Sequence, residues 1–227
     1  MGYLLNHPEV ILRLTGQHLY MTVVSLLIAT LIALPLSVVL LRNERLASVV
    51  LGILGVFYTI PSIALLILLL PIFGLNQTAV IAALVIYTQI ILVRNMVTGL
   101  KGVPEPTLEA AKGVGMNVWQ RWTKVQLPLA LPVILAGVRI AAVVAVAIAT
   151  IGAKFGAGGL GTLLFDGIAQ NRYDKIVAGS VAVALLAFVL NRLLIAAEDH
   201  FDVAKRIARL EKKQKRGTTA VVPPDLP

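Results

Sequence analysis

Apolar residues fill long stretches of this chain, and charged residues interrupt them at only a few places. The run from Leu19 to Leu41 carries no charge and is long enough for a helix to cross a hydrocarbon core about 30 Å thick. It is too long for a signal-peptide core, and neither a basic segment before it nor a small-residue cleavage site after it is present. We therefore expect the first membrane-spanning helix here, retained in the mature protein.

The rest of the pattern predicts four further spans. No charged residue occurs from Leu46 to Val93, and turn-forming residues divide this stretch near its middle, at Pro71, Gly74, Asn76 and Gln77. Spans are predicted over 47–70, 78–97, 129–150 and 176–197. The fold class is an all-α polytopic membrane protein with five transmembrane helices. The predicted organisation is an extracytoplasmic segment 1–17, a five-helix transmembrane domain 18–200 and a basic cytoplasmic tail 201–227, partly disordered.

Composition supports a membrane protein and excludes several kinds of site. The 227 residues are 58% hydrophobic and 14% charged, with a mean hydropathy of +0.89, well outside the range of soluble domains. The absence of cysteine excludes disulfides and thiolate ligands. The three histidines are scattered without metal-ligand spacing, so we interpret each as solvated or interfacial and expect no metal site; they are His7, His18 and His200.

The distribution of Lys and Arg predicts the orientation. Cytoplasmic segments of membrane proteins carry an excess of these residues. With the C-terminus inside and the N-terminus outside, 14 of the 20 fall on the cytoplasmic side and 4 on the outer side. The net charge of +9 thus reflects topology, and it does not require a nucleic-acid partner.

A polar insert separates the third and fourth spans. Pro106 suits a first helical turn, Gly113 is expected to stop that helix, and Asn117 with Gln120 forms a weak capping-box signal for a second one. Apolar residues then recur near helical spacing up to Leu127-Pro128, which closes the element. Two short amphipathic helices at a membrane surface suit either lipid headgroups or a docking partner.

The insert resembles the EAA loop of bacterial ABC importer permeases, through Glu109-Ala110-Ala111, Gly115 four residues later and Leu127-Pro128. In that family the loop docks into a groove of the ATP-hydrolysing subunit, and we call residues 101–128 the coupling loop. The resemblance implies ATPase-coupling roles for nine residues: Glu109, Ala110, Ala111, Gly113, Gly115, Trp119, Arg121, Leu127 and Pro128.

Further segments resemble permeases for glycine betaine, choline or carnitine: YTIPSIALL (58–66), LVRN (92–95), LPLALPVILAGVRIA (127–141) and FGAGGLGTLLFDGI (155–168). The resemblance implies the type I importer fold in a bacterial inner membrane, working with a second identical or related permease, two ATPase copies and an extracytoplasmic substrate-binding protein. No P-loop motif occurs, so the chain is predicted to be non-catalytic and without a cofactor, with ATP and Mg bound by the ATPase.

Polar and aromatic residues inside the second and third spans are candidates for a translocation pathway. They are Tyr58, Pro61, Ser62, Tyr87 and Gln89. Aromatic faces hold quaternary ammonium ions, and a proline inside a span frees a backbone carbonyl. The tyrosines are equally explained as interfacial or packing residues. Arg139, inside the fourth span, is interpreted as a snorkelling residue or the partner of Glu109 or Glu105, in preference to a substrate contact.

The segment 151–175 is predicted to be an outer re-entrant or gate element. Its Gly-x-Gly-x-x-Gly pattern at 156–161 lacks the strand that precedes a nucleotide-binding turn, so nucleotide binding is excluded. Small residues there allow a close backbone approach. The candidates for a gate or a binding-protein contact are Lys154, Gly158, Gly159 and Gly161, and Lys154 stands where relatives usually carry an apolar residue.

Two other functions remain open from the sequence. Methionine and other amino-acid ABC permeases share the EAA loop and a similar glycine-rich stretch. An ion-coupled secondary transporter is more remote, because the spans carry no carboxylate between Glu44 and Glu105 or between Glu109 and Asp166.

Overall fold

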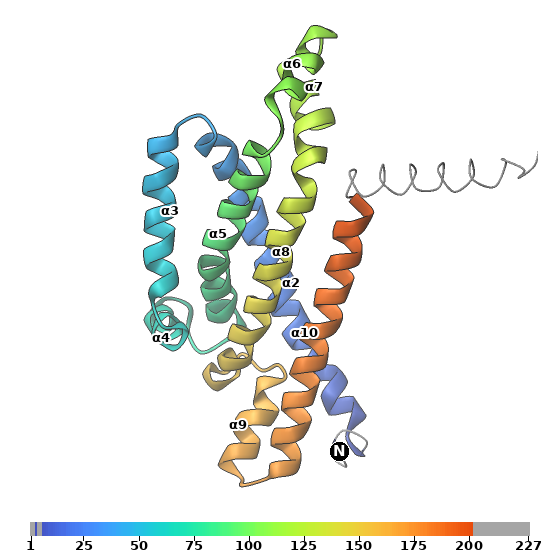
Figure 1. The fold of residues 1–227 in the computed structure, drawn as a ribbon. Helices are drawn as coiled ribbons and strands as arrows, with labels where there is room; N and C mark the ends of the chain where they lie inside the picture. The colour runs from blue at the N-terminus through green and yellow to red at the C-terminus, as the bar shows by residue number, and fades with distance from the viewer. Residues whose placement is uncertain (1–2, 4–5, 202–227) are drawn as a thin grey trace, which may run out of the picture.

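The computed structural model describes residue 3 and residues 6–201, and this part of the chain forms an elongated bundle of helices without strands (Figure 1). In this part of the chain four helical segments are long and apolar enough to cross a membrane: α2 (Pro8–Leu40), α5 (Gln77–Lys101), the continuous segment Val118–Phe155, which contains α8 (Leu127–Gly152), and α10 (Tyr173–Phe201). A bent pair, α3 (Glu44–Thr59) and α4 (Ser62–Phe73), supplies the fifth span if it is counted as one. The predicted fold class is therefore confirmed.

The first helix is longer than predicted. Pro8 occupies the first turn of α2, where its missing N–H costs nothing. The helix is 33 residues long and contains Pro35 near its end. Most of the predicted extracytoplasmic segment 1–17 thus belongs to the same helix as the first span. Helix α10 likewise extends beyond the predicted 176–197. The predicted tail 201–227 lies outside the described residues, apart from Phe201.

The second span is not the single helix predicted over 47–70. Helix α3 ends at Thr59 and α4 starts at Ser62, with a bend of 95° between them. Pro61 has no N–H and disfavours helical backbone in the residue before it, and Ile60 accordingly adopts an extended ψ of 128°. The pair therefore forms an elbow.

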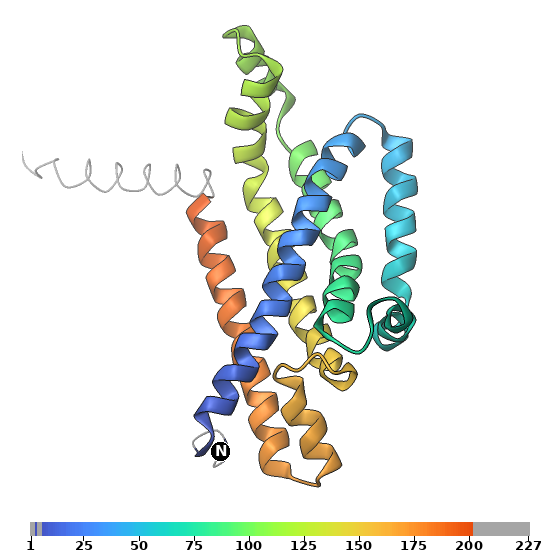
Figure 2. The ribbon, with the colours of Figure 1, turned by 180° about the vertical axis from the view of Figure 1, so that it is seen from behind.

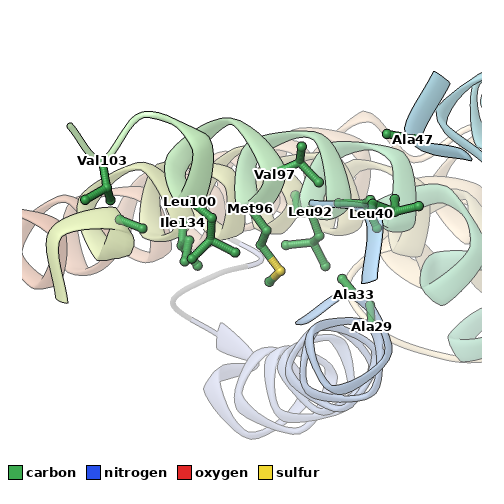
Figure 3. Close-up of a cluster of buried hydrophobic side chains, with 13 residues drawn as sticks. Ala29, Ala33, Leu40, Ala47, Leu92, Met96, Val97, Leu100, Val103 and Ile134 are labelled. Atoms are coloured by element: carbon green, nitrogen blue, oxygen red, sulfur yellow. The ribbon is translucent and has the colours of Figure 1, made fainter. Parts of the chain in front are cut away.

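Helix α5 lies at the centre of the bundle and packs against α2, α3, α4 and α8. Figure 3 shows one buried cluster around it, with Leu92, Met96 and Leu100 meeting small residues of α2 and Ile134 of α8. Alanines at 29 and 33 let α2 approach α5 closely. A second cluster joins α4, α5 and α8. The central helix holds the elements at both ends of the bundle in place.

The polar insert is built from α6 (Glu105–Gly113) and α7 (Val118–Arg121). Leu127-Pro128 does not close it: α7 continues through a π-helical segment, Trp122–Gln126, into α8. The N–H of Leu127 bonds to the carbonyl of Trp122, five residues back, and Pro128 then falls in the first turn of α8. Because the π turn is wider than an α turn, Pro128, which has no N–H, falls at a position where the helix needs no backbone donor.

The two ends of the bundle carry different elements (Figures 1 and 2). Helices α6 and α7 project at one end, near the connection between α2 and α3. The start of α2, the helix α4 and a short helix α9 (Gly161–Ala169) lie at the other end. Helix α10 packs on α8 and α9, and its buried residues are Ala178 and Gly179.

Candidate functional site

The first half of the coupling loop ends in a turn that requires glycine. The N–H of Met116 bonds to the carbonyl of Ala111 and the N–H of Gly115 to that of Lys112, at 3.2 and 3.0 Å. This pair of bonds is the Schellman motif, and its left-handed position falls on Gly115, with a φ of +81°. Gly113, predicted as the stop, is the last helical residue, and its φ is not positive.

The second half begins with the predicted capping box. The Asn117 side chain accepts a bond from the N–H of Gln120 at 2.8 Å, and the Gln120 side chain accepts one from the N–H of Asn117 at 3.0 Å. These bonds satisfy backbone groups that a helix start leaves free. The turn between α6 and α7 is therefore specified by its own residues.

This turn presents apolar side chains to the outside. Val114, Val118 and Trp119 are 75%, 72% and 70% exposed, and the rings of Trp119 and Trp122 stack with centroids 5.7 Å apart. Glu109 and Ala110 are exposed as well, whereas Ala111 is buried. Exposed apolar residues that gather on a projecting turn are typical of an interaction surface. Among the nine predicted coupling residues, the exposed ones are Glu109, Ala110, Gly113, Gly115 and Trp119.

The pathway candidates separate into two places. Tyr58, at the end of α3, meets Tyr87 of α5 edge-to-face at 5.9 Å, and the Tyr87 hydroxyl donates to the carbonyl of Ile60 inside the elbow. Pro61 and Ser62 adjoin this carbonyl, while the Tyr58 ring remains exposed. Gln89 lies elsewhere: it is buried and its Nε2 donates to the carbonyl of Ala29 in α2 at 3.1 Å. Four of the five candidates therefore form one cluster, at the elbow.

The glycine-rich segment, residues 156–161, approaches its neighbours closely. Gly156, Gly158 and Gly159 have positive φ. The N–H of Gly159 donates to Gln17 of α2 at 3.0 Å, and a Cβ on Gly161 would collide with the backbone carbonyl of Thr150. This close approach was predicted from the small residues. Lys154, in the short 3-10 turn before it, is exposed with its Nζ 5.7 Å from the centre of the Phe165 ring.

Sequence reasoning missed Gln17 and misjudged His18. His18 is not solvated: it is fully buried in α2, and its Nε2 lies 3.1 Å from the carbonyl of Val146 in α8. A Cβ on Gly159 would lie 3.2 Å from His18 Nδ1. The two residues form the surface on which the glycine-rich segment rests. The signal available in the sequence was that Gln17 and His18, two polar residues, directly precede an uncharged apolar run.

Arg139 pairs with a residue that the sequence did not suggest. Its Nε lies 3.3 Å from Oε2 of Glu198 in α10, and neither side chain is more than a third exposed. The predicted partners Glu109 and Glu105 are therefore wrong. An ion pair inside a bundle neutralises a charge that is costly to bury. The structure thus supports a structural role for Arg139.

Comparison with known proteins gives one family and a set of close relatives. Residues 14–207 match the family described as binding-protein-dependent transport system inner membrane component. A glycine betaine/carnitine/choline transport system permease protein of Bacillus subtilis is 34% identical over 198 residues, covering 87% of this chain and 91% of that protein. An osmoprotectant import permease protein of Salmonella typhimurium is 39% identical over 197 residues, covering 85% and 92%.

Solved structures agree on the fold. The inward-facing methionine ABC transporter MetNI superposes with a TM-score of 0.70 at 26% identity, covering 84% of this chain and 97% of that one. A second crystal form of the same transporter gives a TM-score of 0.69 at 28% identity.

Proposed function

Because this chain belongs to the family of binding-protein-dependent transport system inner membrane components, we propose that it is the permease subunit of an ATP-driven importer of quaternary-ammonium osmoprotectants. Glycine betaine, choline and carnitine are the substrates named for relatives that align over more than three quarters of the chain at 34–36% identity, and a further relative, 39% identical, is named as an osmoprotectant permease. These relatives favour an osmoprotectant over the amino-acid alternative, whose solved transporter is less similar in sequence.

The projecting turn of the coupling loop carries this proposal. Its two valines, Val114 and Val118, and Trp119 stand at one end of the bundle and are 70–75% exposed in the described part of the chain. A partner ATPase with an apolar groove would bury them, and its closure on ATP would push on α7. Because α7 continues without a break into α8, that push would reach the bundle core as a movement of one long helix.

The coupling loop end is proposed to face the cytoplasm. Arg42, Arg45 and Lys101 gather at that end, in agreement with the excess of basic residues expected inside. The glycine-rich segment and α9 would then face the extracytoplasmic side, where a substrate-binding protein docks. Lys154 and the glycines are proposed as its gate or contact. A second permease copy would complete the pathway, since five spans are few to enclose one.

The elbow between α3 and α4 is the proposed place where the substrate passes. Tyr58 offers an exposed aromatic face beside backbone that is not hydrogen-bonded as regular helix. A cation that lacks N–H donors binds to such a face through its charge alone. Gln89, whose Nε2 is bonded to α2, stays a proposed pathway residue apart from this elbow.

Uptake into proteoliposomes tests the function. The vesicles would contain this chain with its ATPase, ATP inside, and the binding protein outside with labelled betaine, choline, carnitine or methionine. We expect ATP-dependent uptake of at least one quaternary amine. Uptake of methionine alone would overturn the substrate class but keep the coupling. Uptake that ignores ATP would overturn the proposed function.

A further inference from the structure

An apolar groove of about 660 Å³ lies between the end of α2 and the start of the continuous α7–α8 helix. Its α2 wall is formed by Leu34, Pro35, Val38 and Val39, and its opposite wall by Val118, Trp119 and Trp122. Arg42 lines one end. The volume falls in the range of small-molecule sites. Arg42 is the one residue of this lining whose side chain carries a formal charge.

The groove has the dimensions of one lipid chain in one leaflet. Its lining on this side runs from Leu34 in α2 to Arg42, two residues past the end of that helix, about 12 Å at the helical rise of 1.5 Å per residue. One leaflet contributes about half of a 30 Å hydrocarbon core. Tryptophan and arginine are the residues that membrane proteins place at the level of the headgroups. The groove therefore begins at the interface and runs into the apolar region.

The apolar face of α2 continues beyond the groove. Leu27, Leu31, Leu34 and Val38 recur one turn apart on α2, and the first two line a second apolar groove of about 510 Å³ between α2, α8 and α10. Leu27 and Leu31 are exposed by 59% and 74%. A chain lying along this face would meet mostly leucine and valine side chains as it leaves Arg42, with Thr22 and Thr30 also in the lining of the second groove.

Arg42 supplies the charge that selects the headgroup. Its side chain is exposed, and it forms no ion pair with any residue in the described part of the chain. We propose that the groove binds an anionic phospholipid, with one acyl chain along α2 and the headgroup phosphate on Arg42. Because Trp119 also belongs to the exposed turn of the coupling loop, the bound lipid would support the side of that turn that faces α2. This site is independent of the transported substrate.

The chain contains two tryptophans, and both line the groove, so all of the tryptophan fluorescence comes from residues of this groove. The purified full-length chain would be placed in phosphatidylcholine nanodiscs. A fixed minor fraction of lipid would carry brominated acyl chains, either as phosphatidylglycerol or as phosphatidylcholine. Bromine quenches tryptophan on contact. We expect brominated phosphatidylglycerol to occupy the site about five-fold more strongly than brominated phosphatidylcholine, the preference that one cation near the membrane surface gives.

Two variants test whether Arg42 causes the preference for phosphatidylglycerol. Arg42→Gln is expected to lower the preference to nearly one while leaving quenching by both lipids in place. Arg45→Gln is the matched control, because Arg45 is exposed at the same end of the bundle and does not line the groove. It should keep the five-fold preference.

Several results would overturn the proposal. One is equal quenching by the two lipids in the unmodified chain, which would mean that the tryptophans meet only bulk lipid. Another is a preference that survives Arg42→Gln. A third is weak quenching with two copies per nanodisc and strong quenching with one, which would show that a second copy of the chain covers the groove.

Discussion

The coupling loop and the glycine-rich segment lie at opposite ends of one bundle and acquire their shapes in different ways (Figure 1). In the coupling loop the decisive bonds join residues within five positions of each other, and the space around Gly113 and Gly115 is open. In the glycine-rich segment the backbone rests on Gln17, from which Gly159 is 142 positions away. One turn is specified locally and left free for a partner, whereas the other is specified by packing.

The largest expected effect comes from placing a charge on the free turn. Gly115→Asp should abolish ATP-driven uptake while the protein still inserts in the membrane. A Cβ at position 115 would meet no atom within 4 Å in the described part of the chain, and its left-handed backbone costs only about 1–2 kcal/mol. The loss would therefore arise at the docking surface. Uptake is measured in proteoliposomes with matched amounts of permease.

Two variants sharpen this prediction. Gly115→Asn has nearly the same shape as Asp without its charge and should retain part of the uptake. Gly52→Ala, in open space on α3 and outside the coupling loop, should leave uptake unchanged. Normal uptake by Gly115→Asp would show that the coupling assignment is wrong.

At the packed end, Gly161→Ala should cost stability. Its Cβ would overlap the backbone carbonyl of Thr150, which cannot move without displacing α8. Overpacking of this kind typically costs about 1–3 kcal/mol. Thermal unfolding in detergent is the measurement, and Gly16→Ala in α2, where space is open, is the control. An unchanged unfolding temperature for Gly161→Ala would contradict the packed description.

Gln17→Ala should loosen the same segment by a smaller amount. It removes the partner of the buried Gly159 N–H, and an unsatisfied buried donor costs about 1–3 kcal/mol before water or relaxation compensates. Faster hydrogen exchange across 156–161 is expected. Gln17→Glu keeps an acceptor and should exchange more slowly than Gln17→Ala; equal rates would mean that this bond does not hold the segment.

Asn117→Ala should have the smallest effect on the whole molecule. Losing the cap costs about 1 kcal/mol, and it is confined to the first turn of α7. Hydrogen exchange should increase at 118–121 with no change in the unfolding temperature. A lower unfolding temperature would show that the coupling loop is part of the cooperative core after all.

This contrast also explains what the sequence could predict. The capping box and the helix start at Pro106 depend on neighbours in the chain, so both were predicted and found. The buried position of His18 depends on Val146, and the partner of Arg139 lies 59 residues away in α10. No local pattern contains those pairings. The elbow at Pro61 had a local signal, but the apolar run continued through it, which favoured a single span.

Light-activated cross-linking tests the central claim most directly. The chain has no cysteine, so Val118→Cys can carry a single photoreactive group on the exposed turn of the coupling loop. Ile168→Cys, 60% exposed in α9 at the other end, is the matched control. In the assembled transporter the account predicts that the group at 118 cross-links to the ATPase subunit and the group at 168 does not. Absence of an ATPase adduct from 118, or an equal adduct from 168, would contradict it.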